Sequence, residues 1–351
     1  MSSSDIENAG FEAIDAKCKE LYGDQKGSHF GVKLPYALGG PDPLDQVSVY
    51  VSNSGGTTHW HYITYGLTEL YSKESDLEEE SGFGFELTFR LEKKDEETPP
   101  LWPVSLLQNL ARYVFKSGNV FQANEHMDAN GPICLESDTK LTALGFDIDP
   151  ELGDMDTPYG FAEFIQVIPY TKDELECTML WQSDKFIALY RKQNPMAVAF
   201  MDRDSYLTIP EFKAEAEAGI AEDGSSTGMF YIDSADMEVL EEDGKRYLGF
   251  KIGANNMRKL ANILRARLGK DRDFYLKTPS MDIAFQPSEQ SAFGKEEEDF
   301  GLIKLSPESL EDFTSVPQHK GKYLLKTMPA IVEIIPTVIK DNNGNVVETI
   351  E

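Results

Sequence analysis

The chain has 351 residues, of which 40 % are hydrophobic and 11 % are aromatic. This length is most simply divided between two domains, and the apolar content is enough for folded interiors, which excludes wholesale disorder. Lys and Arg total 33 against 61 Asp and Glu, so the net charge is −28. Such an acidic chain disfavours nucleic acid and anionic membranes as partners, and it favours basic proteins.

The cysteines and the apolar runs indicate in which cellular compartment the protein is expected. Cys18, Cys134 and Cys177 lie far apart and have no CxxC spacing, which is typical of reduced thiols rather than of a disulfide framework or a zinc site. The first ten residues hold no basic or long apolar stretch, so they do not resemble a secretory signal. No apolar run reaches the length of a membrane span. We therefore expect a cytoplasmic protein, and we expect it to be a monomer.

Hydrophobic periodicity predicts two helices and three strands in the first part of the chain. Residues 5–22 carry apolar side chains at helical spacing, and a second helix is expected from about Pro103. Residues 47–51 alternate as in a half-buried strand, and a second strand is expected from His59. Residues 81–92 alternate so that one face of a strand is apolar: Phe83, Phe85, Leu87, Phe89 and Leu91.

Strands and helices alternate through the rest of the chain without a strict βαβ rhythm. A basic helix is expected at 255–270, and Ser306-Pro307-Glu308 is typical of a helix start. The expected strands are residues 161–169, 196–201, 246–253, 281–286, 300–305 and 330–335. This arrangement favours an α+β fold.

We expect two domains, each a mixed or antiparallel sheet packed with helices, with a cleft between them. Residues 213–228 are acidic, rich in Gly and Ser and poor in large apolar side chains, so they are the expected inter-domain segment. The N-terminal domain is then residues 1–212 and the C-terminal domain residues 229–351.

His59 and His61 are the first candidates for chemistry. On a strand, residues two apart share a face, and some metal sites use this spacing. A catalytic metal site usually needs a third ligand, which no other histidine supplies by its position, and Trp60 and Tyr62 on the opposite face are expected in the core. Structural histidines are the favoured interpretation, and a metal-assisted hydrolase that uses the His59/His61 face is the alternative.

Other patterns for catalysis or cofactor binding are incomplete. Gly82 and Gly84 lie inside a predicted strand, whereas a phosphate-binding loop needs a strand–loop–helix context. No serine lies in a GxSxG motif, and acidic pairs are unavoidable among 61 acids. We therefore expect no cofactor and no enzymatic activity.

Several stretches carry a resemblance to a known family. They are residues 39–50, 59–67, 81–90 and 110–121, and less specifically 219–232 and 278–286. In these stretches the chain resembles the Suppressor of fused family, in its two-domain form and without the long insertions of animal members. The resemblance implies a binding protein rather than an enzyme.

The resemblance also implies a mode of binding. Family members hold an extended transcription-factor peptide between their two domains by adding it to sheet edges. Carried over by position, the partner-binding residues are Tyr113, Glu125 and His126 in the first domain. The others are Thr227 at the end of the inter-domain segment and Met229, Phe230 and Tyr231 in the second domain, with Leu248 and Phe250 as weaker candidates. Glu125 stands where animal members have Asp, so the peptide that is bound can differ.

Two versions of this role, and one plain alternative, remain open. The chain can sequester a transcription-factor-like peptide, or, if it is bacterial, act as an immunity protein that neutralises a basic toxin, which the acidic charge would favour. In the plain alternative, Tyr113 belongs to the core, Glu125 is a solvated loop acid, and residues 227–232 only continue a sheet.

Overall fold

The chain crosses three times between two separately packed units. The computed structural model describes residues 8–135, 137–340 and 346–350. The first unit is Met1–Leu175 with Ile187–Ile209, and the second is Glu176–Phe186 with Pro210–Glu351. Both units combine helices with sheets of mixed strand direction, so the α+β fold predicted from the sequence is confirmed.

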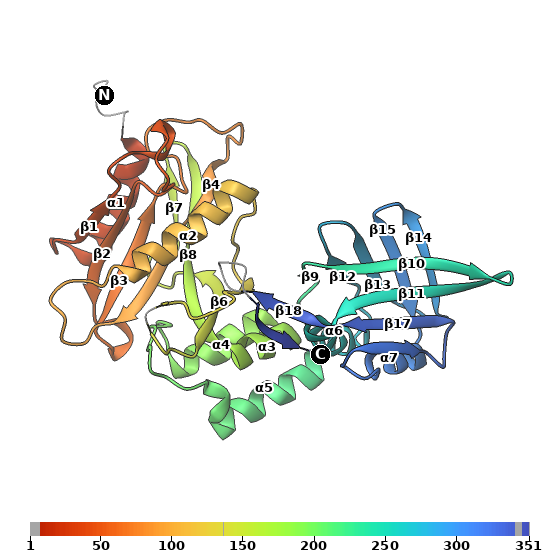
Figure 1. Ribbon diagram of the computed structural model, residues 1–351. Coiled ribbons are helices and arrows are strands. Elements are labelled where there is room, and N and C mark those ends of the chain that lie inside the picture. The colour runs from red at the N-terminus through yellow and green to blue at the C-terminus, as the bar shows by residue number, and fades with distance from the viewer. Residues whose placement is uncertain (1–7, 136, 341–345, 351) are drawn as a thin grey trace. The chain divides into compact units, whose positions relative to one another are not determined.

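An eight-stranded sheet forms the centre of the first unit (Figure 1). Its strands pair antiparallel except β4 and β8, which run parallel. The order across the sheet is β1 (Ser28–Gly31), β2 (Gln46–Ser52), β3 (His59–Tyr65), β4 (Glu80–Glu92), β8 (Gly160–Thr171), β6 (Leu141–Ile148) and β5 (His126–Asp128), and β7 (Asp154–Thr157) pairs with β8.

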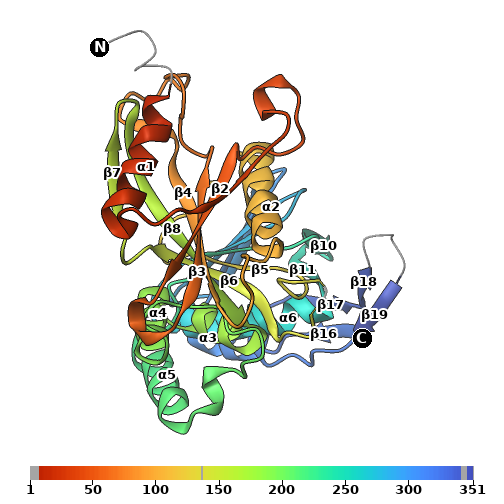
Figure 2. The same cartoon turned by 90° about the vertical axis from the view of Figure 1, so that its left-hand side faces the viewer.

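Helices cover both faces of this sheet. Helix α1 (Ala9–Tyr22) lies on one face and α2 (Trp102–Ser117) on the other, as Figure 2 shows. The predicted apolar stripe of β4 packs under α2. Strand β2 was expected to be half-buried, and this is wrong: Val47 and Val49 face α2, while Tyr50 packs with α1. The sequence pattern could not reveal the second covering helix.

Three further helices, α3 (Lys172–Leu180), α4 (Ser183–Gln193) and α5 (Pro210–Asp223), lie where the chain changes units. Most of the predicted inter-domain segment 213–228 is helix α5 of the second unit, because its alanines and glutamates are strong helix formers. The strand expected at 196–201 is absent from the described structure, where Ala199 makes only an isolated bridge. No helix in the described ranges is long and apolar enough to cross a membrane.

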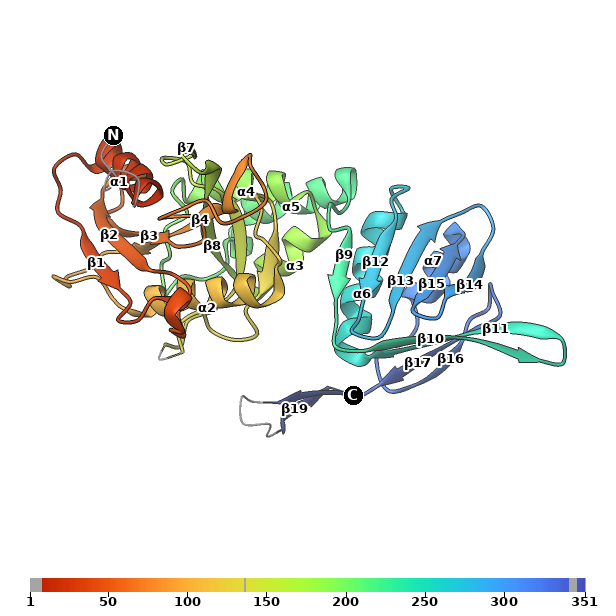
Figure 3. The same cartoon turned by 90° about the horizontal axis from the view of Figure 1, so that it is seen from above.

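The second unit contains two larger sheets and a hairpin (Figure 3). The five-stranded sheet has the order β14 (Ala292–Glu297), β15 (Phe300–Leu305), β13 (Asp282–Pro287), β12 (Phe274–Lys277) and β9 (Met229–Tyr231). The four-stranded sheet has the order β10 (Ala235–Glu242), β11 (Lys245–Gly253), β17 (Ala330–Ile335) and β16 (Gly321–Leu324). The hairpin pairs β18 (Thr337–Lys340) with β19 (Val346–Ile350).

Helices α6 (Ala254–Leu268) and α7 (Pro307–Thr314) complete this unit. Helix α6 buries its apolar face, as its periodicity predicted. Ser306 caps α7 by accepting a hydrogen bond from the Ser309 N–H, which confirms the predicted helix start. Aromatic rings join the sheets to α7, since the ring of Phe250 lies 5.9 Å from Phe285 and 5.4 Å from Phe313.

Candidate protein-binding site

Tyr113 is the first predicted partner-binding residue, and it is accessible. Its side chain is 40 % exposed on α2, so its assignment to the core in the plain alternative is wrong. The ring stacks on Phe121 at 5.7 Å between centroids, and its hydroxyl accepts a hydrogen bond from Asn119 Nδ2 at 2.9 Å. These contacts hold an amphipathic ring at the surface beside the segment that leads into β5.

Glu125 and His126 follow at the start of β5. Glu125 is exposed, and its Oε2 accepts a hydrogen bond from the Gln122 N–H at 3.0 Å. Burial lowers the pKa of His126 to about 4, so its imidazole is neutral at pH 7. Among the described residues, no group hydrogen-bonds to His126 Nδ1, which is a buried atom.

Strand β5 is the last strand of its sheet. It pairs with β6 on one side, and within the described ranges no strand pairs with its other side. The outer side of a terminal strand presents backbone N–H and C=O groups that a further strand can use. The edge that strand addition requires is therefore present next to Glu125 and His126.

The second set of predicted residues lies on another terminal strand, β9. Met229 and Tyr231 are 45 % and 66 % exposed, whereas Phe230 on the opposite face is half-buried, with Lys259 Nζ 5.9 Å from its ring centroid. Thr227, just before the strand, is buried, and its Oγ1 has no hydrogen-bond partner among the described residues. Strand β9 pairs with β12 on one side and ends its sheet on the other.

Leu248 and Phe250 require a correction. Their side chains are 0 % and 1 % exposed, and Phe250 is part of the aromatic core of the second unit. Alternation along β11 correctly placed them on one face, but the sequence does not tell which face is covered. They cannot contact a partner without unfolding of the core.

One surface residue beside β9 was missed. Tyr275 on β12 is directly opposite Met229 and is 36 % exposed. Together with Tyr231 it extends the apolar surface from the edge strand onto its neighbour. Only the parallel pairing of β9 with β12, which brings together distant parts of the chain, reveals this position.

His59 and His61 are fully buried in a charged cluster on the α1 face of the eight-stranded sheet. The Nδ1–H of His59 donates to the Thr57 carbonyl at 2.7 Å, and its Nε2 accepts from Arg90 Nη1 at 3.1 Å. His61 lies between Tyr22 Oη, 2.5 Å from Nδ1, and Asp149 Oδ2, 3.2 Å from Nε2. His59 is thus hydrogen-bonded at both ring nitrogens and His61 at Nδ1, while His61 Nε2 lies close to Asp149 without hydrogen-bond geometry. These contacts inside the protein favour the structural interpretation.

Asp149 is the centre of this charged cluster. Its carboxylate accepts hydrogen bonds at 2.8 Å from Arg90 Nη2 and from Thr88 Oγ1. Burial alone would raise the pKa of Asp149, but the contacts with His61 and Arg90 outweigh it and hold the pKa well below its ordinary value. Burial lowers the pKa values of both histidines, that of His59 to about 4. The cluster is therefore an ionised Asp149–Arg90 pair with neutral imidazoles.

The family model of Suppressor of fused protein (SUFU) matches residues 40–204. The Suppressor of fused homolog of Homo sapiens is 35 % identical over 235 residues, which are 62 % of this chain and 48 % of that relative. The homolog of Mus musculus matches to the same extent. The chain thus spans about half the length of the curated relatives it matches.

The similarity to solved structures covers a larger part of this chain than the similarity to the curated relatives. The crystal structure of Drosophila Suppressor of Fused has a TM-score of 0.79 and 21 % identity, covering 93 % of this chain and 97 % of that one. A chain of the Sufu-Fu complex crystal structure has a TM-score of 0.58 and 30 % identity, covering 62 % of this chain and 99 % of that one. A two-domain α+β protein with these sequence relatives is a Suppressor of fused-type protein. The chain belongs to the Suppressor of fused family.

Proposed function

We propose that this chain is a non-enzymatic binding module that sequesters a protein partner by adding an extended segment of the partner to its sheet edges. A family member in complex with Fu supports protein binding as the general role. The proposal rests on one observation: the predicted partner-binding residues other than Leu248 and Phe250 lie on or beside β5 and β9, two terminal strands. Backbone hydrogen bonds to such edges supply affinity, and neighbouring side chains supply specificity.

The exposed side chains define what each edge recognises. At β5, Glu125 offers a carboxylate to a polar or basic group, and Tyr113 offers an aromatic face. At β9, Met229 and Tyr231 offer apolar surface. Because Glu has one methylene more than the Asp of animal members, its carboxylate reaches further, and the partner's polar group is expected to lie further from the backbone.

The charge of the whole chain indicates the kind of partner. With a net charge of −28, long-range attraction accelerates association with basic proteins. A basic toxin and a basic transcription-factor-like peptide both satisfy this requirement. We place the function in the cytoplasm, where reduced cysteine thiols are stable, and we propose that the protein is a monomer. The burial of His59 and His61 speaks against a hydrolase built on their face.

Affinity capture tests the proposal. The protein is used as bait on lysate of its own organism, at low and moderate salt, and captured proteins are identified by mass spectrometry. We expect a basic protein that is retained by wild type and lost with Tyr113→Ala combined with Glu125→Ala. Lys116→Ala, on the same helix, is the matched control and should retain it. Equal capture by the double variant would exclude these residues from the site.

Hydrogen exchange then tests the mode of binding. If the captured partner adds a strand, backbone amides of β5 and β9 should exchange more slowly in the complex, because their outer groups become hydrogen-bonded. Amides of β16, another terminal strand, serve as the control and should not change. Protection elsewhere, with β5 and β9 unchanged, would refute strand addition while leaving protein binding intact.

A further inference from the structure

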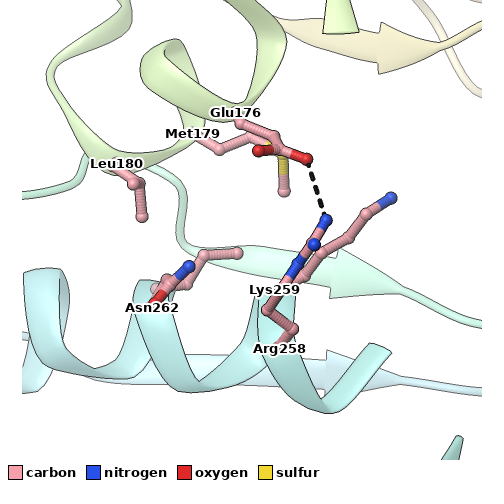
Figure 4. A pocket seen from close by; sticks show the side chains of 7 residues that line it. Glu176, Met179, Leu180, Arg258, Lys259 and Asn262 are labelled. Atoms are coloured by element: carbon pink, nitrogen blue, oxygen red, sulfur yellow. Dashed lines mark hydrogen bonds and ion pairs between the residues drawn. The ribbon is translucent and has the colours of Figure 1, made fainter. Parts of the chain in front are cut away.

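A small pocket lies between α3 and α6, entirely within the second unit (Figure 4). Its cavity volume is about 40 Å³. Side chains from the end of α3 face side chains from the middle of α6 across it. The lining residues are Glu176, Met179, Leu180, Arg258, Lys259, Asn262 and Ile263.

The pocket has an apolar floor and a polar rim. Met179 and Ile263 are buried and form the floor. At the rim lie the polar side chains of Arg258, Lys259 and Asn262, from consecutive turns of α6. An apolar base with a few polar groups at its edge is typical of ligand sites.

The charge at the rim is opposite to that of the chain. Two cations, Arg258 and Lys259, face one acid, Glu176, although the whole chain carries a net charge of −28. The ion pair between Arg258 Nη2 and Glu176 Oε1 is 3.3 Å long, and both side chains are nearly half exposed. Exposed pairs of this kind contribute little and open readily. Glu176 is therefore only weakly bound to Arg258. Its carboxylate is the same chemical group that a carboxylate ligand would offer to Arg258.

We propose that this pocket binds a carboxylate carried on a short apolar body. The apolar part would contact Met179 and Ile263, and the carboxylate would displace Glu176 from Arg258 and accept hydrogen bonds at the rim. The volume corresponds to roughly three water molecules, which suits one side-chain-sized group and is too small for a nucleotide or a larger cofactor. Two sources share this chemistry: a carboxylate of a bound peptide, and a free aliphatic acid. The site does not depend on strand addition at β5 or β9.

Methyl NMR of the full chain tests the proposal with defined probes. N-acetyl-leucine carries the proposed chemistry, and N-acetyl-leucinamide has the same body without the charge. We expect saturable shifts of the Met179 and Ile263 methyl signals with N-acetyl-leucine, at a dissociation constant of about 1–10 mM for so small a ligand. The amide should cause no saturable shift. Equal responses to both probes, or no response, would overturn the proposal.

Two variants with opposite expected effects separate binding from a structural disturbance. Arg258→Gln should weaken N-acetyl-leucine binding at least about tenfold, because a charged hydrogen bond is lost. Glu176→Gln should tighten it severalfold, because the competing carboxylate is removed. Arg265→Gln, which changes an exposed arginine of the same helix outside the pocket, is the control and should leave binding unchanged. Unchanged binding by Arg258→Gln, with an unaltered unfolding temperature, would overturn the proposal.

Two further probes distinguish the sources. Isovalerate represents a free aliphatic acid, and N-acetyl-glutamic acid α-amide represents an acidic side chain within a peptide. Tighter binding of isovalerate assigns the pocket to small acids, and tighter binding of either acetylated amino acid assigns it to a peptide. Failure of every carboxylate to bind would reject the site and would leave the proposed strand addition untouched.

Discussion

The two buried faces of the eight-stranded sheet differ in how many charged and polar side chains they bury. Under α2, the face is apolar and includes Tyr62, Leu87 and Phe89. Under α1, the same strands bury His59, His61, Glu86, Thr88 and Arg90. Strand β4 contributes large side chains to both faces. A strand of alternating apolar and polar residues therefore need not have a solvent-exposed face. Polar residues can be buried when hydrogen bonds and opposite charges within the protein compensate them.

Removal of Asp149 should produce the largest effect. Asp149→Ala leaves the buried Arg90 without its bidentate partner and removes an acceptor for the N–H groups of Glu151 and Leu152. We expect a loss of about 3–5 kcal/mol in the free energy of unfolding, measured by chemical denaturation. Asp147→Ala removes a partly exposed ion pair with Arg191, whose side chains are 23 % and 19 % exposed, and should cost below about 1 kcal/mol. Similar losses in both variants would mean that burial does not set the cost.

Truncation on the apolar face should cost somewhat less and should not depend on pH. Leu87→Ala leaves a cavity under α2, and we expect a loss of about 3 kcal/mol from the lost burial and the cavity. Denaturation at pH 7 and pH 5 should give the same difference from wild type. A difference that changes with pH would show that the two faces are energetically coupled through β4.

The charged face should make stability depend on pH. The pKa of His59 is about 4 in the folded protein and lies near its ordinary value of 6.5 when unfolded, so below that ordinary value the unfolded state binds more protons. Stability should be full above about pH 7 and should fall as the pH drops towards 4, by up to about 1.4 kcal/mol per pH unit for this residue. His59→Gln should flatten the dependence, and an unchanged slope would contradict the assigned burial.

The smallest effect is expected where α1 meets the charged face. Tyr22→Phe removes the hydroxyl that contacts His61 but retains the stacking of the ring on Tyr50 at 4.4 Å. We expect a loss of about 1 kcal/mol in the free energy of unfolding. Tyr36→Phe changes an exposed tyrosine and serves as control. A loss above about 3 kcal/mol would mean that Tyr22 closes the cluster against water rather than adding one hydrogen bond.

Local patterns predicted much of this fold from the sequence. The apolar face of β4, helices α2 and α6, and strands β15 and β17 lie where periodicity placed them. The charged cluster could not be predicted, because Asp149 meets Arg90 only through the parallel pairing of β4 with β8 and the return of β6. Pairing between distant strands leaves no regular spacing in a sequence.

The candidate site was predictable only in part, and for a related reason. The resemblance supplied the positions on β5 and β9, but whether a strand ends its sheet depends on the pairing of all the others. Leu248 and Tyr275 show the same limit. Leu248 was predicted to contact a partner but is buried, whereas Tyr275 was not predicted but is exposed. Alternation predicted which residues of a strand share a face, but it did not show that the face of Leu248 is buried and that of Tyr275 is exposed.

The three crossings between units have a consequence for the order of synthesis. Residues 176–186 emerge from the ribosome early, yet they pack in the second unit, whose other residues begin at Pro210. Trp181 lies against Gly219 and donates a hydrogen bond to Asp223 at 2.8 Å. At ordinary rates of translation, Trp181 waits about a few seconds for these residues. During that interval the nascent chain presents an uncovered indole, and until Ile209 is made the first unit is incomplete as well.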